Sequence, residues 1–333
     1  MDKTQIETQI ETETEPTFDN DSYIMSKILP ILGNRRAGMT NWMPPPPPKK
    51  IGNSLLSLQH FNMRSINFNP YRVEGSVSVI IGRRGTGKSV LIKDLLYHHQ
   101  DIPVKSVIVG TKEDCNFYKN IIPKINVTIH PEYNTTIIEN ILKQQQLMNA
   151  QIKKDKEINK EKNKEIKTYQ QSTIDGRCLC VLDNCFYDYK WTKDKMMPYL
   201  FFNARSFRVM SVISMGHPLA IPSHFRTNVD YVFIFKDNNN LDNRRRIFDN
   251  YTGMFPTFES FCQVMDQCTE NYECLVINNN VKSNRLQDQV FWYKADTHNN
   301  FRLGSPEFWE LSKSINDDDD DESDEEKPKK SKH

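Results

Sequence analysis

Eight consecutive residues have the types and the spacing of a phosphate-binding loop. They match the pattern G-x-x-x-x-G-K-[ST] and are Gly82, Arg83, Arg84, Gly85, Thr86, Gly87, Lys88 and Ser89. Glycines let such a loop curl until its backbone N–H groups point at phosphate oxygens. The lysine then reaches the β- and γ-phosphates, and the serine hydroxyl is a ligand for Mg²⁺. The loop therefore predicts binding of a nucleoside triphosphate, ATP with Mg²⁺.

The segments on either side of the loop strengthen this prediction. Residues 76–81 are apolar and mostly β-branched, which is typical of a buried strand, and residues 90–96 have apolar positions at helical spacing. A strand, this loop and then a helix is the context that the phosphate-binding motif requires. The alternative is a glycine-rich turn between strand and helix that binds nothing.

A second motif would supply the acid that a magnesium–phosphate site needs. Residues 178–183 form a short apolar run that ends in Asp183, as expected of a strand with a metal-linked carboxylate at its tip. The alternative is an aspartate that caps a turn. The next residue is Asn184, which can orient a water but cannot take its proton. At the tip of the following strand, His217 is a candidate for sensing the γ-phosphate, and the alternative is a loop histidine with no catalytic role.

Two arginines are candidates for a residue that acts on a neighbouring subunit's nucleotide. Arg205 lies at the end of a predicted helix, and Arg226 lies just before the strand predicted at residues 230–235. Either could stabilise transition-state charge as an arginine finger. The alternative for each is a surface or salt-bridged arginine. Residues 244–246, three arginines in a row, predict a basic helix face that could contact a phosphate backbone.

The formal net charge of +1 combines two acidic ends with a basic middle. Residues 1–20 contain six acidic residues and one lysine, and residues 317–333 contain nine acidic residues and four lysines. Residues 21–316 therefore contain 28 acidic and 39 basic residues, a net charge of +11. A basic body suits a polyanionic partner such as double-stranded DNA, and a merely solvated basic face is the alternative.

Composition also bounds the class of protein. The chain of 333 residues has seven cysteines without a C-x-x-C pair, which favours reduced thiols inside a cell over a zinc site. No run of about 18 apolar residues occurs, so we expect no membrane span. The acidic, Thr-rich N-terminus resembles neither a signal peptide nor a transit peptide.

The order of predicted elements favours an α/β fold. Residues 1–50, acidic and then proline-rich, and the charged tail at 317–333 are expected to be disordered. Between them, residues 51–316 form one domain with a charged insertion at 151–171. Strands and helices alternate in this domain, which indicates a mainly parallel sheet with helices on both faces. The predicted strands are 76–81, 105–110, 127–130, 177–182, 208–215, 230–235, 273–277 and 289–292, and the predicted helices include 113–122, 134–148, 193–202, 240–251 and 257–267.

A resemblance to a known family rests on the motifs and on several longer segments in a fixed order. These segments are residues 82–89, 181–185, 191–195, 222–233, 261–267, 270–276 and 289–294. Over about residues 70–310 the chain resembles the genome-packaging ATPases of nucleocytoplasmic large DNA viruses. Those proteins are relatives of the poxvirus packaging ATPase, in the FtsK–HerA group of P-loop motors.

The resemblance implies a RecA-like core of the additional-strand type, a ring-shaped homo-oligomer and ATP hydrolysis. It also implies translocation of double-stranded DNA into a capsid, capsid or portal partners, and a location in the host cytoplasm at the viral factory or in the virion. Lys88 and Ser89 would hold phosphate and Mg²⁺, and Asp183 would hold the metal-bound water. Arg205 stands in Asn-Ala-Arg, where the family usually has Asn-Gly-Arg.

Two departures from the family leave the rate of hydrolysis open. The family commonly has a second acid at the position of Asn184 and a glutamine at the position of Gly216. Both lie on the side of the site that activates water. The leading hypothesis is an ATP-driven packaging motor. The alternative is a nucleotide-binding assembly or regulatory subunit derived from such a motor, and a small-molecule kinase is a third hypothesis that lacks a recognisable acceptor site.

Overall fold

The computed structural model describes residues 45–52, 56–66, 73–100, 106–124, 127–162, 174–185, 189–237, 241–299, 301–303, 306 and 309–314. The chain divides into two compact units, Met1–Thr40 and Asn41–His333, and every described residue belongs to the second. The tail predicted at 317–333, residues 1–44 of the predicted N-terminal region and residues 163–171 of the predicted insertion lie outside the described residues.

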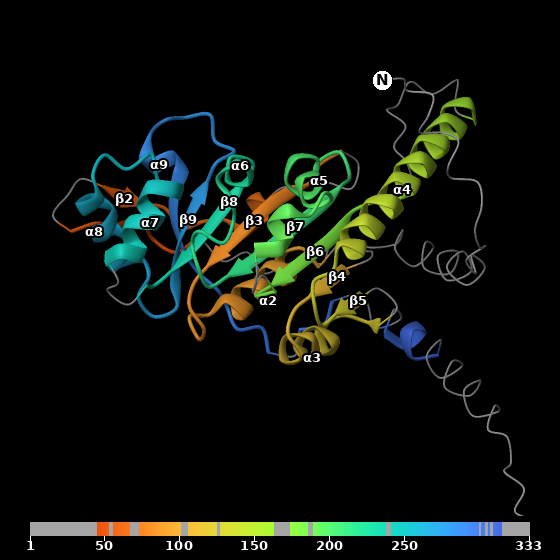
Figure 1. The fold of residues 1–333 in the computed structure, drawn as a ribbon, viewed down its shortest axis with the longest axis horizontal. Coiled ribbons are helices and arrows are strands. Elements are labelled where there is room, and N and C mark those ends of the chain that lie inside the picture. Colours follow the sequence, from red (N-terminus) through yellow and green to blue (C-terminus); the bar gives the residue numbers. More distant parts are fainter. Residues whose placement is uncertain are drawn as a thin grey trace, which may run out of the picture. The chain divides into compact units, whose positions relative to one another are not determined.

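An eight-stranded sheet forms the centre of the second unit, in the order β10-β9-β8-β3-β7-β6-β4-β5 (Figure 1). Five neighbouring pairs are parallel, and only β8 with β9 and β9 with β10 are antiparallel. The mainly parallel sheet predicted from the sequence is therefore confirmed. The strands are β3 (Ser76–Ile81), β4 (Ser106–Val109), β5 (Val127–His130), β6 (Cys178–Asp183), β7 (Val209–Met215), β8 (Tyr231–Phe235), β9 (Glu273–Asn278) and β10 (Val290–Lys294).

The two strands that carry the motifs are separated by one strand. β7 lies between β3, which leads into the phosphate-binding loop, and β6, which ends in Asp183. This is the additional-strand arrangement that the resemblance implied. In the register of the three strands, Ile81 pairs with Met215 and Ser214 pairs with Asp183. The carboxyl ends of these three strands therefore lie side by side at one end of the sheet, because parallel strands run in the same direction.

Side chains that alternate along the strands create two buried layers. On one face, Val77, Val79 and Ile81 of β3 share a cluster with α4 (Thr135–Lys162), α5 (Met197–Phe202), α6 (Ser223–Arg226), α7 (Leu241–Tyr251) and α8 (Phe258–Cys268). On the other face, Ile80 shares a cluster with α2 (Lys88–His98), α3 (Lys112–Ile121) and the 3-10 turn η2 (Met63–Ser65). Since both faces of β3 are covered, all six of its residues are buried.

A short hairpin covers the β10 edge of the sheet. Lys49–Lys50 (β1), which the sequence analysis placed at the end of the N-terminal region, pair with Ser57–Leu58 (β2). His60 then bridges to Trp292 of β10, and the Lys49 ammonium lies 4.4 Å from the centre of the Trp292 ring. The connection before β10 is the short helix α9 (Leu286–Gln289).

Two helices differ from the predictions. The helix predicted at 134–148 continues to Lys162 as α4, and its charged second half extends beyond the sheet (Figure 1). The helix predicted at 193–202 is wrong in its first part, which is a 3-10 turn, η4 (Tyr189–Lys193), and a bend. α5 begins only at Met197, because Pro198 suits the first turn of a helix and not its interior. None of the helices in the described ranges is long and apolar enough to cross a bilayer.

Candidate nucleotide-binding site

The phosphate-binding loop connects the end of β3 directly to the start of α2. Lys88 is 6% exposed, and its ammonium Nζ donates to the carbonyl oxygens of Gly82, at 2.8 Å, and Arg83, at 3.1 Å. Ser89 follows in the first turn of α2, where unpaired backbone N–H groups and the helix dipole favour an anion. The loop thus has its lysine folded back over its own backbone, with Arg83, Arg84 and Gly85 exposed.

Packing explains why two of the loop positions must be glycine. A Cβ on Gly82 would lie 2.6 Å from the hydroxyl of Thr86 and 2.9 Å from Cβ of Phe235, closer than atoms tolerate. Gly87 has φ of +108°, in the region that favours glycine, and a Cβ there would lie 3.3 Å from the Phe235 ring. Phe235, the last residue of β8, therefore packs against the loop at both glycines. The sequence did not reveal this role.

Asp183 is fully buried at the tip of β6, beside the loop. Its Oδ1 accepts a hydrogen bond from the hydroxyl of Ser214 on β7, and its Oδ2 accepts one from the hydroxyl of Tyr118 on α3, at 2.9 Å. The backbone N–H of Asn184 donates to the carbonyl and the hydroxyl oxygen of Ser214, each at 3.2 Å. Asn184 has φ of +49°, a conformation that asparagine tolerates better than most residues. Sequence reasoning missed both Ser214 and Tyr118 as partners of Asp183.

A cavity of about 1240 Å³ lies beside the loop, and Asn184 and Ser214, the neighbours of Asp183, line it while Asp183 itself does not. One side is formed by the loop and the first turn of α2, and a second by Asn184 and the tip of β7 from Ser214 to His217. Tyr272, Lys294, Ala295 and Thr297 line a third side. The volume is sufficient for a nucleoside triphosphate, since ligand pockets are commonly about 300–1,000 Å³. The structure thus brings together, around one cavity, the loop, Asn184, Gly216 and His217.

The residues present fit a magnesium ion that is shared with phosphate. Mg²⁺ keeps several waters and takes one or two protein oxygens together with substrate phosphates. Ser89 offers a hydroxyl in the cavity, and the fully buried carboxylate of Asp183 lies directly behind Ser214, which lines the cavity and donates a hydrogen bond to it. Within the described ranges, no group of three His, Cys, Asp or Glu side chains could hold a metal alone. The donors therefore suit an ion that arrives with the nucleotide.

The two candidate arginines lie away from this cavity. Arg205 donates to Asp230 Oδ1 at 2.6 Å and to Asn280 Oδ1 at 2.9 Å, with two thirds of its side chain (66%) exposed. The other oxygen of Asp230 accepts a hydrogen bond from the backbone N–H of Val77 at 2.8 Å, near the start of β3. The phosphate-binding loop follows the other end of this strand, so Arg205 and Asp230 lie at the end of the sheet opposite the loop of their own chain.

Arg226 is held within its own chain. Its guanidinium donates to the carbonyl oxygen of Ile221 at 2.8 Å and to Asn250 Oδ1 at 2.7 Å, and it lies 5.6 Å from the Tyr251 ring. The basic face expected from three successive arginines is also incomplete. Arg244 is 4% exposed and pairs with Asp266 at 2.6 Å, because this side of α7 faces α8.

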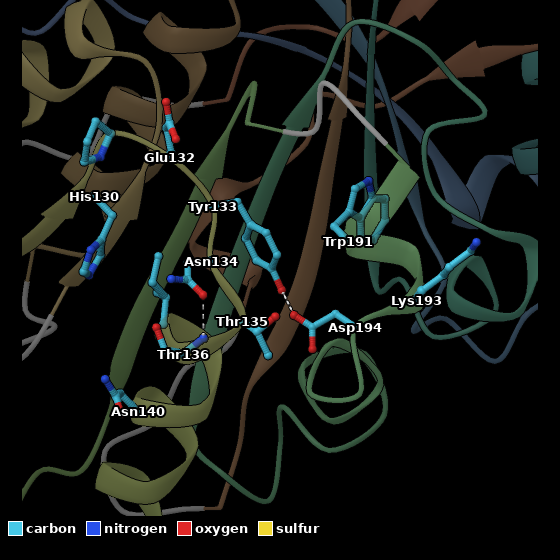
Figure 2. Close-up of a pocket in the computed structure, with 12 residues that line it drawn as sticks. His130, Glu132, Tyr133, Asn134, Thr135, Thr136, Asn140, Trp191, Lys193 and Asp194 are labelled. Atoms are coloured by element: carbon cyan, nitrogen blue, oxygen red, sulfur yellow. Dashed lines mark hydrogen bonds between the residues drawn. The ribbon is translucent and has the colours of Figure 1, made fainter.

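A second cavity of about 730 Å³ lies between the end of β5 with the start of α4 on one side and residues 191–194 on the other (Figure 2). Figure 2 shows the Tyr133 hydroxyl pointing at the carboxylate of Asp194, to which it donates a hydrogen bond. Asp194 also accepts the N–H of Met196 at 2.7 Å. Burial and the adjacent carboxylate raise the pKa of Tyr133 above its ordinary value. These contacts tie the start of α4 to the segment before α5, so Tyr133 and Asp194 have a structural role here.

Comparison with known proteins gives related viral sequences. The chain is 32% identical over 259 residues to uncharacterized protein L437 of Acanthamoeba polyphaga mimivirus, covering 78% of this chain and 85% of that protein. It is 35% identical over 257 residues to uncharacterized protein 075L of Invertebrate iridescent virus 6, covering 76% and 90%. The chain belongs to this family of large DNA virus proteins. The viral family predicted from the sequence segments is thereby confirmed.

Proteins of solved structure are less similar to this chain in sequence than these viral relatives are. The DNA-packaging ATPase B204 of Sulfolobus turreted icosahedral virus is similar to it at a TM-score of 0.44 and 16% sequence identity, over 68% of this chain and 99% of B204. No protein-family model matches the chain.

Proposed function

We propose that the protein is an ATP-hydrolysing motor that moves double-stranded viral DNA into a capsid. The observation that carries the proposal is the convergence of the phosphate-binding loop, Ser214 and Asp183 on the ends of three adjacent parallel strands. This convergence supports a magnesium-linked acid beside the phosphates, the arrangement by which P-loop enzymes position a γ-phosphate for attack. Lys88 and Ser89 would hold the phosphates and Mg²⁺, and Asp183 would hold a metal-bound water.

The DNA-handling part of the proposal rests on charge and on family. Residues 21–316 carry a net charge of +11, and the relatives belong to large DNA viruses. A motor that travels along DNA should grip the phosphate backbone and not the base edges, so its binding should be non-specific. The motor would act as a homo-oligomeric ring with capsid or portal partners, at the viral factory in the host cytoplasm or in the virion.

The finding that Arg205 lies opposite the loop supports a ring. In a head-to-tail arrangement of identical subunits, a residue on one edge of a subunit meets the other edge of the next. Arg205 is largely exposed beyond its bonds to Asp230 and Asn280, so its guanidinium can reorient toward a neighbour's γ-phosphate. Arg226 has three contacts within its own chain and is the weaker candidate for an arginine finger.

A nucleotide-binding assembly or regulatory subunit is a second candidate function, and one observation favours it. No atom lies within 4 Å of the position that a Cβ on Gly216 would occupy, so this wall of the cavity lacks a side chain. Asn184 also stands where the family commonly has a second acid, so neither of these two positions supplies a base.

Turnover of ATP with and without double-stranded DNA separates the two functions. We expect turnover that DNA stimulates and that Lys88→Ala abolishes. Lys93→Ala is a matched control, because Lys93 lies on the same helix but does not line the cavity. Tight ATP binding with no turnover under either condition would reject the motor and support the regulatory subunit.

DNA binding has its own measurement. Affinity for DNA of unrelated sequences should be similar and should fall steeply as salt rises, since released counterions drive backbone contacts. Binding that is insensitive to salt, or that depends on sequence, would contradict a motor that grips the backbone.

A further inference from the structure

Tyr272 is the most exposed large apolar side chain among the described residues, at 69%. It is also the only Phe, Tyr or Trp side chain among the described residues that line the 1240 Å³ cavity. A tyrosine ring normally gains stability by burial, and this one is instead presented at the side of a ligand-sized hollow. Its exposure is therefore a feature that a ligand could explain.

The backbone that carries Tyr272 is strained. The N–H of Glu273 donates to the carbonyl of Glu270 at 2.9 Å, which closes a four-residue turn between α8 and β9. Both central residues have positive φ, +50° at Asn271 and +64° at Tyr272. Turns of this kind prefer asparagine followed by glycine, so the tyrosine occupies a position where glycine would be relaxed. A bulky residue in this conformation is rare, and such strain occurs most often at functional sites.

The turn is fixed firmly enough to hold that strain. On its N-terminal side, the Thr269 hydroxyl donates to the carbonyl of Met265 at 2.6 Å, and Glu270 pairs with Lys236 at 2.7 Å. On its C-terminal side, Glu273 pairs with Lys49 and continues into β9. The backbone position from which the Tyr272 side chain leaves the turn is therefore set by the fold before any ligand arrives.

Sheet order decides which part of a nucleotide would face Tyr272. The loop leaves β3, and the acid of the site lies on the side of β7 and β6, so the γ-phosphate and Mg²⁺ face that side. β8 and β9 lie on the other side of β3. Because β9 is antiparallel to β8, the turn that holds Tyr272 lies at the end of the sheet where β3 runs into the loop. A Cβ on Gly87 would lie 3.7 Å from Cδ1 of Tyr272, so the ring borders the loop where the nucleoside must leave it.

We propose that Tyr272 stacks on the nucleobase of the bound nucleoside triphosphate, beside the segment that includes Lys294, Ala295 and Thr297. The inference rests on the proposed nucleotide site and adds the base to it. Stacking on an aromatic ring is worth about 5- to 150-fold in affinity per base, and it accepts any base because each has a π face. Tyr272 thus tethers the nucleoside while the loop holds the phosphates.

The test compares a nucleotide with a ligand that has phosphates but no base. Affinities of the full-length protein for Mg²⁺–ATP, Mg²⁺–GTP and magnesium tripolyphosphate are measured by calorimetry for the wild type, Tyr272→Gly, Tyr272→Phe and Tyr272→Trp. Tyr272→Gly suits this purpose because glycine relieves the turn and should not unfold the protein. Tyr199→Ala removes an exposed tyrosine on α5, which does not line the cavity, and serves as the control.

We expect Tyr272→Gly to weaken ATP and GTP binding by about 10-fold while tripolyphosphate binding stays unchanged. Tyr272→Phe and Tyr272→Trp should keep wild-type affinity, because the ring and not the hydroxyl makes the contact. Equal ATP affinity in the wild type and Tyr272→Gly would overturn the stacking role and leave the nucleotide site standing. An equal loss for ATP and tripolyphosphate would also overturn it, whereas a wild type that binds neither ligand would refute the nucleotide site itself.

Discussion

The hydroxyl of Tyr118 donates a 2.9 Å hydrogen bond to Oδ2 of Asp183, so a helix on one face of the sheet holds the acid at the tip of β6. The hydroxyl of Ser214 holds the other carboxylate oxygen. Both donors hold the carboxyl group in one orientation, because each binds a different one of its two oxygens. The two hydrogen bonds thus orient Asp183 for the metal-linked role that we propose for it.

Tyr118→Phe should lower the free energy of unfolding by about 1–3 kcal/mol, because it leaves a fully buried carboxylate with one donor fewer and creates no cavity. A ligand that supplies a new donor to Asp183 should restore part of this loss. Urea denaturation with and without Mg²⁺–ATP measures both effects, with the exposed Tyr199→Phe as the control. An equal response to Mg²⁺–ATP in variant and wild type would show that the ligand does not reach Asp183.

Substitution by alanine should destabilise the protein at one glycine of the site and leave its stability nearly unchanged at another. Gly82→Ala places a methyl group within 3 Å of Thr86 and Phe235, and overpacking of this kind typically costs about 1–3 kcal/mol. Gly216→Ala meets no atom within 4 Å and should change stability by less than about 0.5 kcal/mol. Thermal denaturation of the two variants checks the contrast. Equal stability would mean that the loop moves away from Phe235 without penalty.

Stability should fall as the pH drops below about 6.5, the ordinary pKa of histidine. Burial lowers the pKa of His60, His98 and His130, so the unfolded chain binds protons that the folded protein does not. The free energy of unfolding is unaffected by these histidines above about pH 6.5. It decreases as the pH falls from there to the lowered pKa of each folded histidine, by at most about 1.4 kcal/mol per pH unit for each one.

His60→Phe tests this pH dependence at one position. The His60 ring lies 4.7 Å from the ring of Trp292 and 5.0 Å from that of Tyr293, so phenylalanine keeps aromatic packing and removes the titrating group. Urea denaturation at pH 7.5, 6.5 and 5.5 should give a shallower loss for the variant. An unchanged slope would assign the loss to other groups.

Arg205→Ala should leave ATP affinity unchanged and reduce turnover, because Arg205 lies at the sheet edge opposite the loop of its own subunit. An arginine finger supplied by a neighbour accelerates hydrolysis by about 10³–10⁵-fold. Mixing Arg205→Ala subunits with Lys88→Ala subunits should recover part of the turnover, since some interfaces then combine an intact loop with an intact arginine. Mixtures that stay inactive would remove Arg205 from the catalytic machinery.

The sequence predicted those parts of the fold that depend on short-range patterns. The strands at 76–81 and 178–183 have the predicted positions within one residue, because each is a short apolar run bounded by a turn. Residues that meet only in the folded chain left no local signal. Tyr118 reaches Asp183 from another helix, Phe235 supports the loop from a neighbouring strand, and Arg244 is covered by α8.

The last prediction concerns the water-activating side of the cavity. Asn184→Asp introduces a carboxylate, and Gly216→Gln fills open space with an amide that can orient a water, so the double variant restores both groups that the family commonly has. An effective general base contributes about 10²–10⁴-fold to a rate. If the missing base limits the protein, turnover by Asn184→Asp/Gly216→Gln should rise at least about 10-fold while ATP affinity stays the same. Asn184→Ala with Gly216→Ala is the matched control, since it changes both positions without adding a base. A double variant no faster than this control would show that the base comes from another residue or subunit.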